Sequence, residues 1–144
     1  MKTGPVIFGT DDSVYVRIVR LALEEKRVDY TLEPVDVFAA GGPPADYLDR
    51  HPFGRMPAFE FSGFRLYETG AITRYIDEVF EGAPLQPDNI EGRARMNQII
   101  GIADSYVYRP LVWDIFVERI NKPGEGKVPT KAGSLPASKG RTSP

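Results

Sequence analysis

The chain of 144 residues contains 42% hydrophobic and 26% charged residues, as an ordinary globular protein does, and has room for one domain or for a small domain with a further fragment. Its formal net charge of −2 argues against charge-driven binding to nucleic acid or to an anionic membrane. The absence of cysteine excludes disulfides, thiolate metal sites and a cysteine nucleophile, and the single histidine cannot form a metal cluster by itself, so we expect no metal.

The N-terminal part of the chain predicts a strand followed by a helix. Residues 5–8 form a short apolar run ended by Gly9, which is typical of a buried strand. Residues 11–13, Asp-Asp-Ser, are of the types that cap helix N-termini, so we expect a helix that begins here and ends near Lys26. Apolar residues recur at helical spacing behind this cap, and we expect them to face the core: Val14, Ile18, Leu21 and Ala22.

The middle of the chain predicts a second strand, a loop and a hairpin. Residues 30–37 read as a strand, but Pro34 interrupts them. Residues 39–44, rich in Gly and Pro, predict a loop, and residues 46–50 predict at most a short helix. Two short arms joined by Ser62-Gly63 predict a β-hairpin, in which apolar side chains alternate along each arm: Phe59, Phe61, Phe64 and Leu66.

Helical spacing dominates the residues that follow the hairpin. A helix is expected from Gly70 to about Phe80, residues 83–90 predict a linker, and residues 91–121 predict one long helix that Pro110 should kink. The inward positions expected in the first of these helices are Ala71, Ile72, Tyr75, Ile76 and Val79. The predicted fold class is therefore α/β, with a βαβαββα domain in residues 1–82 followed by a single long helix.

The last part of the chain differs from the rest in composition. Residues 122–144 carry a net charge of +4, whereas residues 1–121 carry −6, and Val128 and Leu135 are the only large apolar residues in this tail. Such a segment buries too little surface to offset its ordering entropy, so we expect disorder. The abrupt change also suggests the hypothesis that residues from about Val128 onward are an out-of-frame read, which the coding DNA would settle.

Two segments carry a resemblance to a known family. The predicted order of elements, with a proline entering the third strand, resembles the thioredoxin fold. The segment HPFGRMPAFEF, residues 51–61, resembles the Asn-Pro-x-Gly-x-x-Pro-x-Leu segment of cytosolic glutathione transferases, and YETGAITRYI, residues 67–76, resembles their Glu-Ser-x-Ala-Ile-x-x-Tyr-Leu segment. Residues 8–32 are similar to the opening of the serine-type classes, above all the plant phi class.

The resemblance implies a glutathione site at the ends of two neighbouring elements. Pro57 is expected to be cis, so that Met56 presents its backbone N–H and C=O to the cysteinyl part of glutathione, as an added strand would pair. Glu68 would then hold the ammonium group of the γ-glutamyl end, and Thr69 with the helix N-terminal amides would hold its carboxylate. Taken singly, each residue has a structural explanation that is equally good: Pro57 ends an edge strand, and Thr69 caps a helix.

Ser13 is the catalytic residue that the resemblance implies. Its hydroxyl at a helix N-terminus would stabilise the glutathione thiolate; the alternative is that Ser13 is only an N-cap. The neighbouring carboxylates of residues 11 and 12 oppose thiolate formation unless they point into solvent. Arg55 is expected to bind the glycyl carboxylate, because this chain has Gly42-Pro43 where phi-like members carry a His-Lys pair. His51 stands where the family has asparagine, and we expect a loop residue with no chemical role.

The function that the resemblance implies is conjugation of glutathione, as co-substrate, to a small electrophile. The alternatives are a non-catalytic transferase-like binding or interaction module and an inactive truncated transferase, in which residues 91–121 are the first helix of a shortened helical domain. A complete helical domain would imply a homodimer. No 18-residue apolar run and no apolar signal-peptide core are present, so we expect a cytoplasmic protein with no membrane partner.

Overall fold

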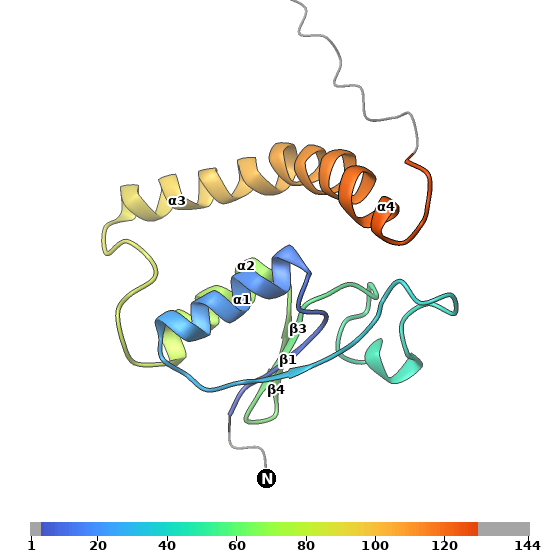
Figure 1. The fold of residues 1–144 in the computed structure, drawn as a ribbon. Coiled ribbons are helices and arrows are strands. Elements are labelled where there is room, and N and C mark those ends of the chain that lie inside the picture. Colours follow the sequence, from blue (N-terminus) through green and yellow to red (C-terminus); the bar gives the residue numbers. More distant parts are fainter. Residues whose placement is uncertain (1–3, 130–144) are drawn as a thin grey trace, which may run out of the picture. The chain divides into compact units, whose positions relative to one another are not determined.

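The computed structural model describes residues 4–129, and the chain divides into two compact units, one ending at Pro87 and one beginning at Asp88. The first unit has the expected α/β order, with the second helix reduced to a single 3-10 turn (Figure 1). Its elements are β1 (Val6–Phe8), α1 (Val14–Glu25), β2 (Thr31–Glu33), η1 (Ala45–Tyr47), β3 (Ala58–Phe61), β4 (Phe64–Tyr67) and α2 (Thr69–Val79).

The four strands form one mixed sheet in the order β2-β1-β3-β4. β1 is parallel to β2 and antiparallel to β3, and β3 and β4 form the expected hairpin. Its two turn residues, Ser62 and Gly63, have φ of 50° and 81°, the positive values that a tight hairpin turn requires. β2 ends at Glu33 rather than near residue 37, because Pro34 has no N–H to donate to the parallel ladder.

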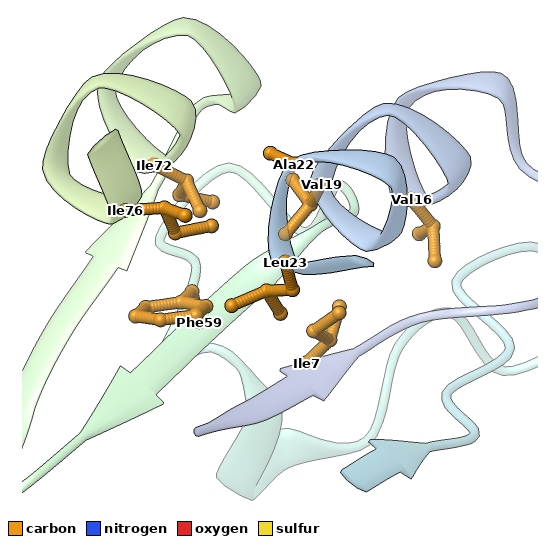
Figure 2. Packing of buried hydrophobic residues seen from close by; sticks show 8 residues of the cluster. All are labelled: Ile7, Val16, Val19, Ala22, Leu23, Phe59, Ile72 and Ile76. Carbon is orange, nitrogen blue, oxygen red and sulfur yellow. The ribbon is translucent and has the colours of Figure 1, made fainter. Parts of the chain in front are cut away.

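Helices α1 and α2 cover one face of the sheet, and the core lies between them and the strands (Figure 2). Each contributes an apolar stripe that meets Ile7 of β1 and Phe59 of β3. The buried helical residues of this core are Val16, Val19, Ala22, Leu23, Ile72 and Ile76.

The expected core face of α1 is wrong at three of its four positions. Val14, Ile18 and Leu21 are exposed by 40%, 40% and 58%, and of the expected residues Ala22 alone is buried. The helix carries two apolar stripes at helical spacing, and the stripe that contains Val16 and Leu23 faces the sheet. In α2 the expected inward residues Ala71 and Val79 are also exposed.

The other face of the sheet carries polar contacts. Ile7 faces the helices, so its neighbour Phe8 faces the opposite side, where the Arg50 guanidinium carbon lies 4.6 Å from the Phe8 ring centroid. Glu60 lies on this side too, 3.8 Å from the Arg50 Nε and 3.1 Å from the Arg65 Nε. The segment between η1 and β3, which includes Arg50, is thereby attached to the sheet.

A buried ion pair joins the two helices. Lys26 Nζ lies 2.6 Å from Asp77 Oδ1, and the two side chains are 2% and 9% exposed. The Asp77 carboxylate also accepts hydrogen bonds from the Leu85 N–H at 2.8 Å and from the Gln86 amide at 3.1 Å. Asp77 therefore fixes α1, α2 and the chain that leaves the domain at one point.

The second unit is a long run of helical residues. α3 (Ile90–Ile102) begins at Asn89, whose side chain accepts a hydrogen bond from the Gly92 N–H at 2.6 Å. It continues with π-helical winding through η2 (Ala103–Val107) and η3 (Arg109–Asn121), and then α4 (Lys122–Gly124). Pro110 does not end the helix, and helical residues extend three positions past the expected end at residue 121. Residues 130–144, on which the expectations of disorder and of an out-of-frame read mostly fall, lie outside the described residues.

Candidate functional site

Ser13 lies at the N-terminus of α1 and caps it. Its extended backbone precedes the helix, and its Oγ accepts a long hydrogen bond, 3.5 Å, from the Val16 N–H. The hydroxyl proton is not used by this bond, because the oxygen acts as the acceptor. The side chain is half-buried. Capping and donation to an anion are therefore compatible at Ser13.

The two carboxylates beside Ser13 are exposed to solvent. Asp11 and Asp12 are both exposed, which weakens their effect on a charge at the helix N-terminus. The Nε of Arg17 donates a 2.8 Å hydrogen bond to the Asp11 carbonyl, so a guanidinium lies against the same loop. The electrostatic objection to an anion near Ser13 is thus largely removed.

The loop that carries Ser13 contacts the loop that precedes β3. Thr10 directs both its N–H and its hydroxyl to the Met56 Sδ, at 3.5 and 3.4 Å. Gly9, with φ of 153°, makes this approach possible, since a Cβ there would lie 2.6 Å from Val16 Cγ2 and 3.3 Å from Met56 Cβ. The Met56-Pro57 peptide bond is cis, which confirms the expectation. Neither the N–H nor the C=O of Met56 has a hydrogen-bond partner among residues 4–129.

The sheet register brings Pro57 and Glu68 to the same edge. β3 and β4 are antiparallel with Ala58 opposite Tyr67, so the residue before Ala58 and the residue after Tyr67 leave the ladder side by side. This explains why a proline and a carboxylate stand at neighbouring ends of the two elements. The Met56-Pro57 bond therefore lies at the neighbouring end to Glu68 and Thr69.

Glu68 has an unusual backbone conformation. Its φ of 72° and ψ of 115° are rare for a residue with a Cβ, and its carbonyl accepts the first two helical hydrogen bonds, from the Ala71 and Ile72 N–H groups at 3.0 Å. The side chain is exposed and caps nothing, and within residues 4–129 its carboxylate forms no ion pair. The carboxylate is available to a cation at the N-terminus of α2.

Tyr47 anchors the backbone next to Met56, a role that sequence reasoning missed. The ring is 2% exposed, and its hydroxyl donates a 2.7 Å hydrogen bond to the carbonyl of Arg55. Burial raises the pKa of Tyr47 to about 12, so the phenol stays protonated and remains a donor. An aromatic residue within a short predicted helix was the only signal, and it does not reveal a partner eight residues away. The guanidinium of Arg55 itself is exposed.

Replacing Tyr47 by phenylalanine should lower the free energy of unfolding by about 1 kcal/mol, because the Arg55 carbonyl loses its donor. Urea unfolding followed by circular dichroism measures this effect. Tyr30→Phe is the matched control, since it removes a phenol that bonds Arg20 and Glu24 on the outside of α1, and we expect a smaller loss there. Equal losses in the two variants would mean that the Tyr47 hydrogen bond stabilises the fold no more than those of Tyr30.

His51 is buried, although it lies in a loop as expected. It is 2% exposed and its ring centroid lies 4.8 Å from that of Tyr67. Burial lowers the pKa of His51 more than the nearby Glu68 carboxylate raises it. The residue is therefore part of the site's support, which its position in a loop motif did not reveal.

Comparison with known proteins finds similar sequences and similar structures. Residues 12–79 match the family model for the glutathione S-transferase N-terminal domain. Residues 12–79 of this chain are thus similar to the N-terminal domain of the glutathione S-transferase family. Glutathione S-transferase F6 of Arabidopsis thaliana is 30% identical over 131 residues, which cover 89% of this chain and 62% of that protein. The phi-like resemblance of the sequence is thereby confirmed.

Solved structures of glutathione S-transferases share the fold. Glutathione S-transferase III in its apo form is 28% identical with a TM-score of 0.76, over 90% of this chain and 60% of that one. The maize glutathione S-transferase I in complex with an atrazine glutathione conjugate is 25% identical with a TM-score of 0.72, over 88% of this chain and 59% of that one. The chain thus spans about three fifths of the length of these relatives.

Neither a metal cluster nor a membrane-spanning helix is found in the described part of the chain. Residues 4–129 contain no cluster of three or more His, Asp or Glu side chains that would hold a metal ion. No helix within that range has both the length and the apolar character needed to cross a bilayer.

Proposed function

We propose that this chain is a glutathione transferase that conjugates the thiolate of glutathione to a small electrophile in the cytoplasm. One observation carries the proposal: the loop of Ser13 contacts Met56 through Thr10, and the sheet register brings Pro57 and Glu68 to the same edge. We assign three kinds of polar group, from three segments, to one ligand: a helix-capping hydroxyl, an unpaired strand-like backbone and an unpaired carboxylate.

Each group fits one part of glutathione. The Met56 N–H and C=O pair with the peptide of the cysteinyl residue, as in strand addition. The Glu68 carboxylate takes the ammonium of the γ-glutamyl residue, while Thr69 and the first amides of α2 take its carboxylate. Arg55, exposed and beside Met56, is the cation we assign to the glycyl carboxylate. We assign the Ser13 hydroxyl to the thiol sulfur of glutathione.

The chemistry requires the glutathione thiol to ionise. A free thiol has a pKa of about 8.5, so most of it is protonated and unreactive at neutral pH. A hydrogen bond from the Ser13 hydroxyl and the N-terminal field of α1 favour the thiolate. The thiol proton passes to solvent, and the thiolate sulfur forms a bond to the electrophilic carbon. In a substitution the bond from that carbon to the leaving group breaks and its electron pair goes with the leaving group. In an addition the π bond breaks and its electron pair takes up a proton from solvent.

Ser13→Ala should lower turnover of a chromogenic aryl halide by at least about 10-fold while glutathione binding stays nearly intact, because the lost donor acts on the anion rather than on the bound ground state. Ser13→Asp separates this role from capping, because aspartate is an equally good N-cap but carries a charge that opposes the thiolate. Turnover in Ser13→Asp equal to that of the wild type would make Ser13 only a cap.

The alternative is a transferase-like module that binds glutathione without turnover, or an inactive transferase. The sequence Gly42-Pro43, in place of the family's His-Lys pair, favours this alternative, because it leaves Arg55 as the cation proposed for the glycyl end. Retention on glutathione-agarose together with an absence of turnover would support it. Retention with turnover supports the enzyme, and no retention at any pH would contradict both.

A further inference from the structure

His51 has a buried polar atom that packing alone does not explain. The residue is 2% exposed, and its Nδ1 is buried without a hydrogen-bond partner among residues 4–129. Leaving such an atom unsatisfied destabilises the folded state, and an apolar side chain of similar size would avoid that cost. The imidazole is also the only one in the chain. Its presence therefore calls for a role.

The position of His51 connects the two segments that face the proposed ligand. Its carbonyl accepts a 2.8 Å hydrogen bond from the Gly54 N–H, in the loop that leads to Met56. Its ring lies against Tyr67, at 4.8 Å between centroids, and Glu68 follows Tyr67 directly. The ring centroids of Tyr47 and Phe53 each lie 6.4 Å from that of His51. A change in the charge or position of the imidazole would thus affect both the Met56 and the Glu68 ends of the site.

We propose that His51 is a positioning residue whose neutral imidazole holds the Tyr67–Glu68 end of β4 against the Met56 loop, and that glutathione binding at Glu68 is linked to the protonation of this imidazole. The inference rests on the proposed function and deepens it, because it names the group that couples binding to pH.

Several charged or titratable groups face the imidazole. Burial lowers the pKa of His51, the Glu68 carboxylate and the residue's own backbone raise it, and the Arg55 guanidinium lowers it. Tyr47 stays neutral, since burial raises its pKa to about 12, and Tyr67 packs against the ring. The guanidinium of the adjacent Arg50 lies over Phe8 and near Glu60. Glu68 is therefore the anion that favours His51 protonation, and it is also the group proposed to bind the ligand's ammonium.

The sign of the linkage follows from this competition. When the ligand's ammonium pairs with Glu68, the field of that carboxylate at His51 is offset, so the pKa of His51 falls further in the complex. Binding then favours the neutral imidazole. Affinity is full above the pKa of His51 in the free protein, falls as the pH drops through that pKa, and levels off below the pKa in the complex.

The first experiment measures the titration of His51 directly. Because the chain has one histidine, the imidazole signals in NMR spectra of the tag-free protein belong to His51 without further assignment. We expect a pKa below 6.5, and a further decrease in Glu68→Gln, where the carboxylate that raises it is lost. Glu24→Gln, at the end of α1, is the control and should not change it. A pKa that is the same in Glu68→Gln and in the wild type overturns the inference.

The second experiment measures binding of S-methylglutathione between pH 5 and 8, since this ligand has no thiol to titrate. The dissociation constant of the wild type should rise roughly 3- to 10-fold toward low pH, which corresponds to a pKa decrease of about half a unit to one unit on binding. His51→Asn should bind well at pH 8 and lose the pH dependence, because its amide occupies the region of Nδ1 but does not titrate. His51→Ala should bind more weakly at every pH.

The outcomes separate the inference from the function on which it rests. Wild-type binding that does not depend on pH, or His51→Asn binding that keeps the full dependence, overturns the role of His51 while the glutathione site stands. A wild type that binds no S-methylglutathione at any pH overturns the proposed function and the inference together. Circular dichroism of each variant establishes that a loss of binding is not a loss of folding.

Discussion

Asp77→Asn is expected to lower the free energy of unfolding by about 3 kcal/mol, the lower end of the range for a broken buried ion pair. The substitution leaves the ammonium of Lys26 buried, with a side chain 2% exposed, and removes the charge that balanced it at 2.6 Å. The asparagine oxygen can still accept the hydrogen bond from the Leu85 N–H, so the loss comes mainly from the unpaired charge.

Urea unfolding followed by circular dichroism measures this effect. The double variant Lys26→Met/Asp77→Asn should recover more than about 1 kcal/mol of the free energy of unfolding relative to Asp77→Asn, because it removes the buried ammonium that is left without a counter-ion. Glu125→Gln is the exposed control; its pair with Lys127 is 56% and 67% exposed, and less than about 1 kcal/mol should be lost. A loss in Asp77→Asn as small as that in Glu125→Gln would mean that Lys26 reaches water.

The pH dependence of stability should carry the same signature. Burial alone would raise the pKa of Asp77, but Lys26, the Leu85 N–H and the Gln86 amide together lower it below its ordinary value of 3.8. A carboxyl group whose pKa is depressed in the folded state stabilises that state fully above the unfolded value. The stability contributed by the Asp77 carboxylate is therefore lost as the pH falls below 3.8 and through the pKa of the folded state. Asp77→Asn should lack this part of the fall in stability at low pH.

The sequence contains enough information for the parts of the fold that local chemistry decides. The hairpin turn at Ser62-Gly63, the proline before β3 and the cap at Ser13 each rest on a few neighbouring residues with a strong backbone preference. Two such signals at a fixed spacing were sufficient to bring Pro57 and Glu68 together, because an antiparallel hairpin must return the chain to the point where it started.

Features that depend on distant parts of the chain were not predictable in this way. Helix α1 has apolar residues on two sides, and only the sheet beneath it decides that Val16 is buried and Ile18 exposed. The Lys26–Asp77 pair joins residues 51 positions apart. His51 is polar and lies in a loop, so burial was not expected from local pattern. Each of these requires the packed structure, in which side chains from separate segments compete for the same space.

Glu68→Gly is expected to abolish retention on glutathione-agarose and yet to make the protein more stable by about 1 kcal/mol. The backbone of Glu68, with φ of 72°, costs about 1–3 kcal/mol for a residue with a Cβ, and glycine avoids that cost. Glycine in turn loses about 0.5–1 kcal/mol through the greater freedom of the unfolded chain, which leaves the net gain. The carboxylate that we assign to the ammonium of glutathione disappears in the same change.

Two further variants separate the backbone from the charge. Glu68→Gln keeps the strained backbone and removes the charge, so binding should weaken roughly 10- to 100-fold, as for a lost charged hydrogen bond, without a gain in stability. Ser62→Gly relieves a positive φ of 50° in the hairpin turn, away from the proposed ligand groups, and should stabilise the protein without changing binding. Measuring Glu68→Gly, Glu68→Gln and Ser62→Gly together tests the predicted loss of binding and the predicted gain in stability. Retention that survives in Glu68→Gly means that the ammonium is held elsewhere. A stability gain in Ser62→Gly but none in Glu68→Gly means that contacts around Glu68 offset the cost of its backbone conformation.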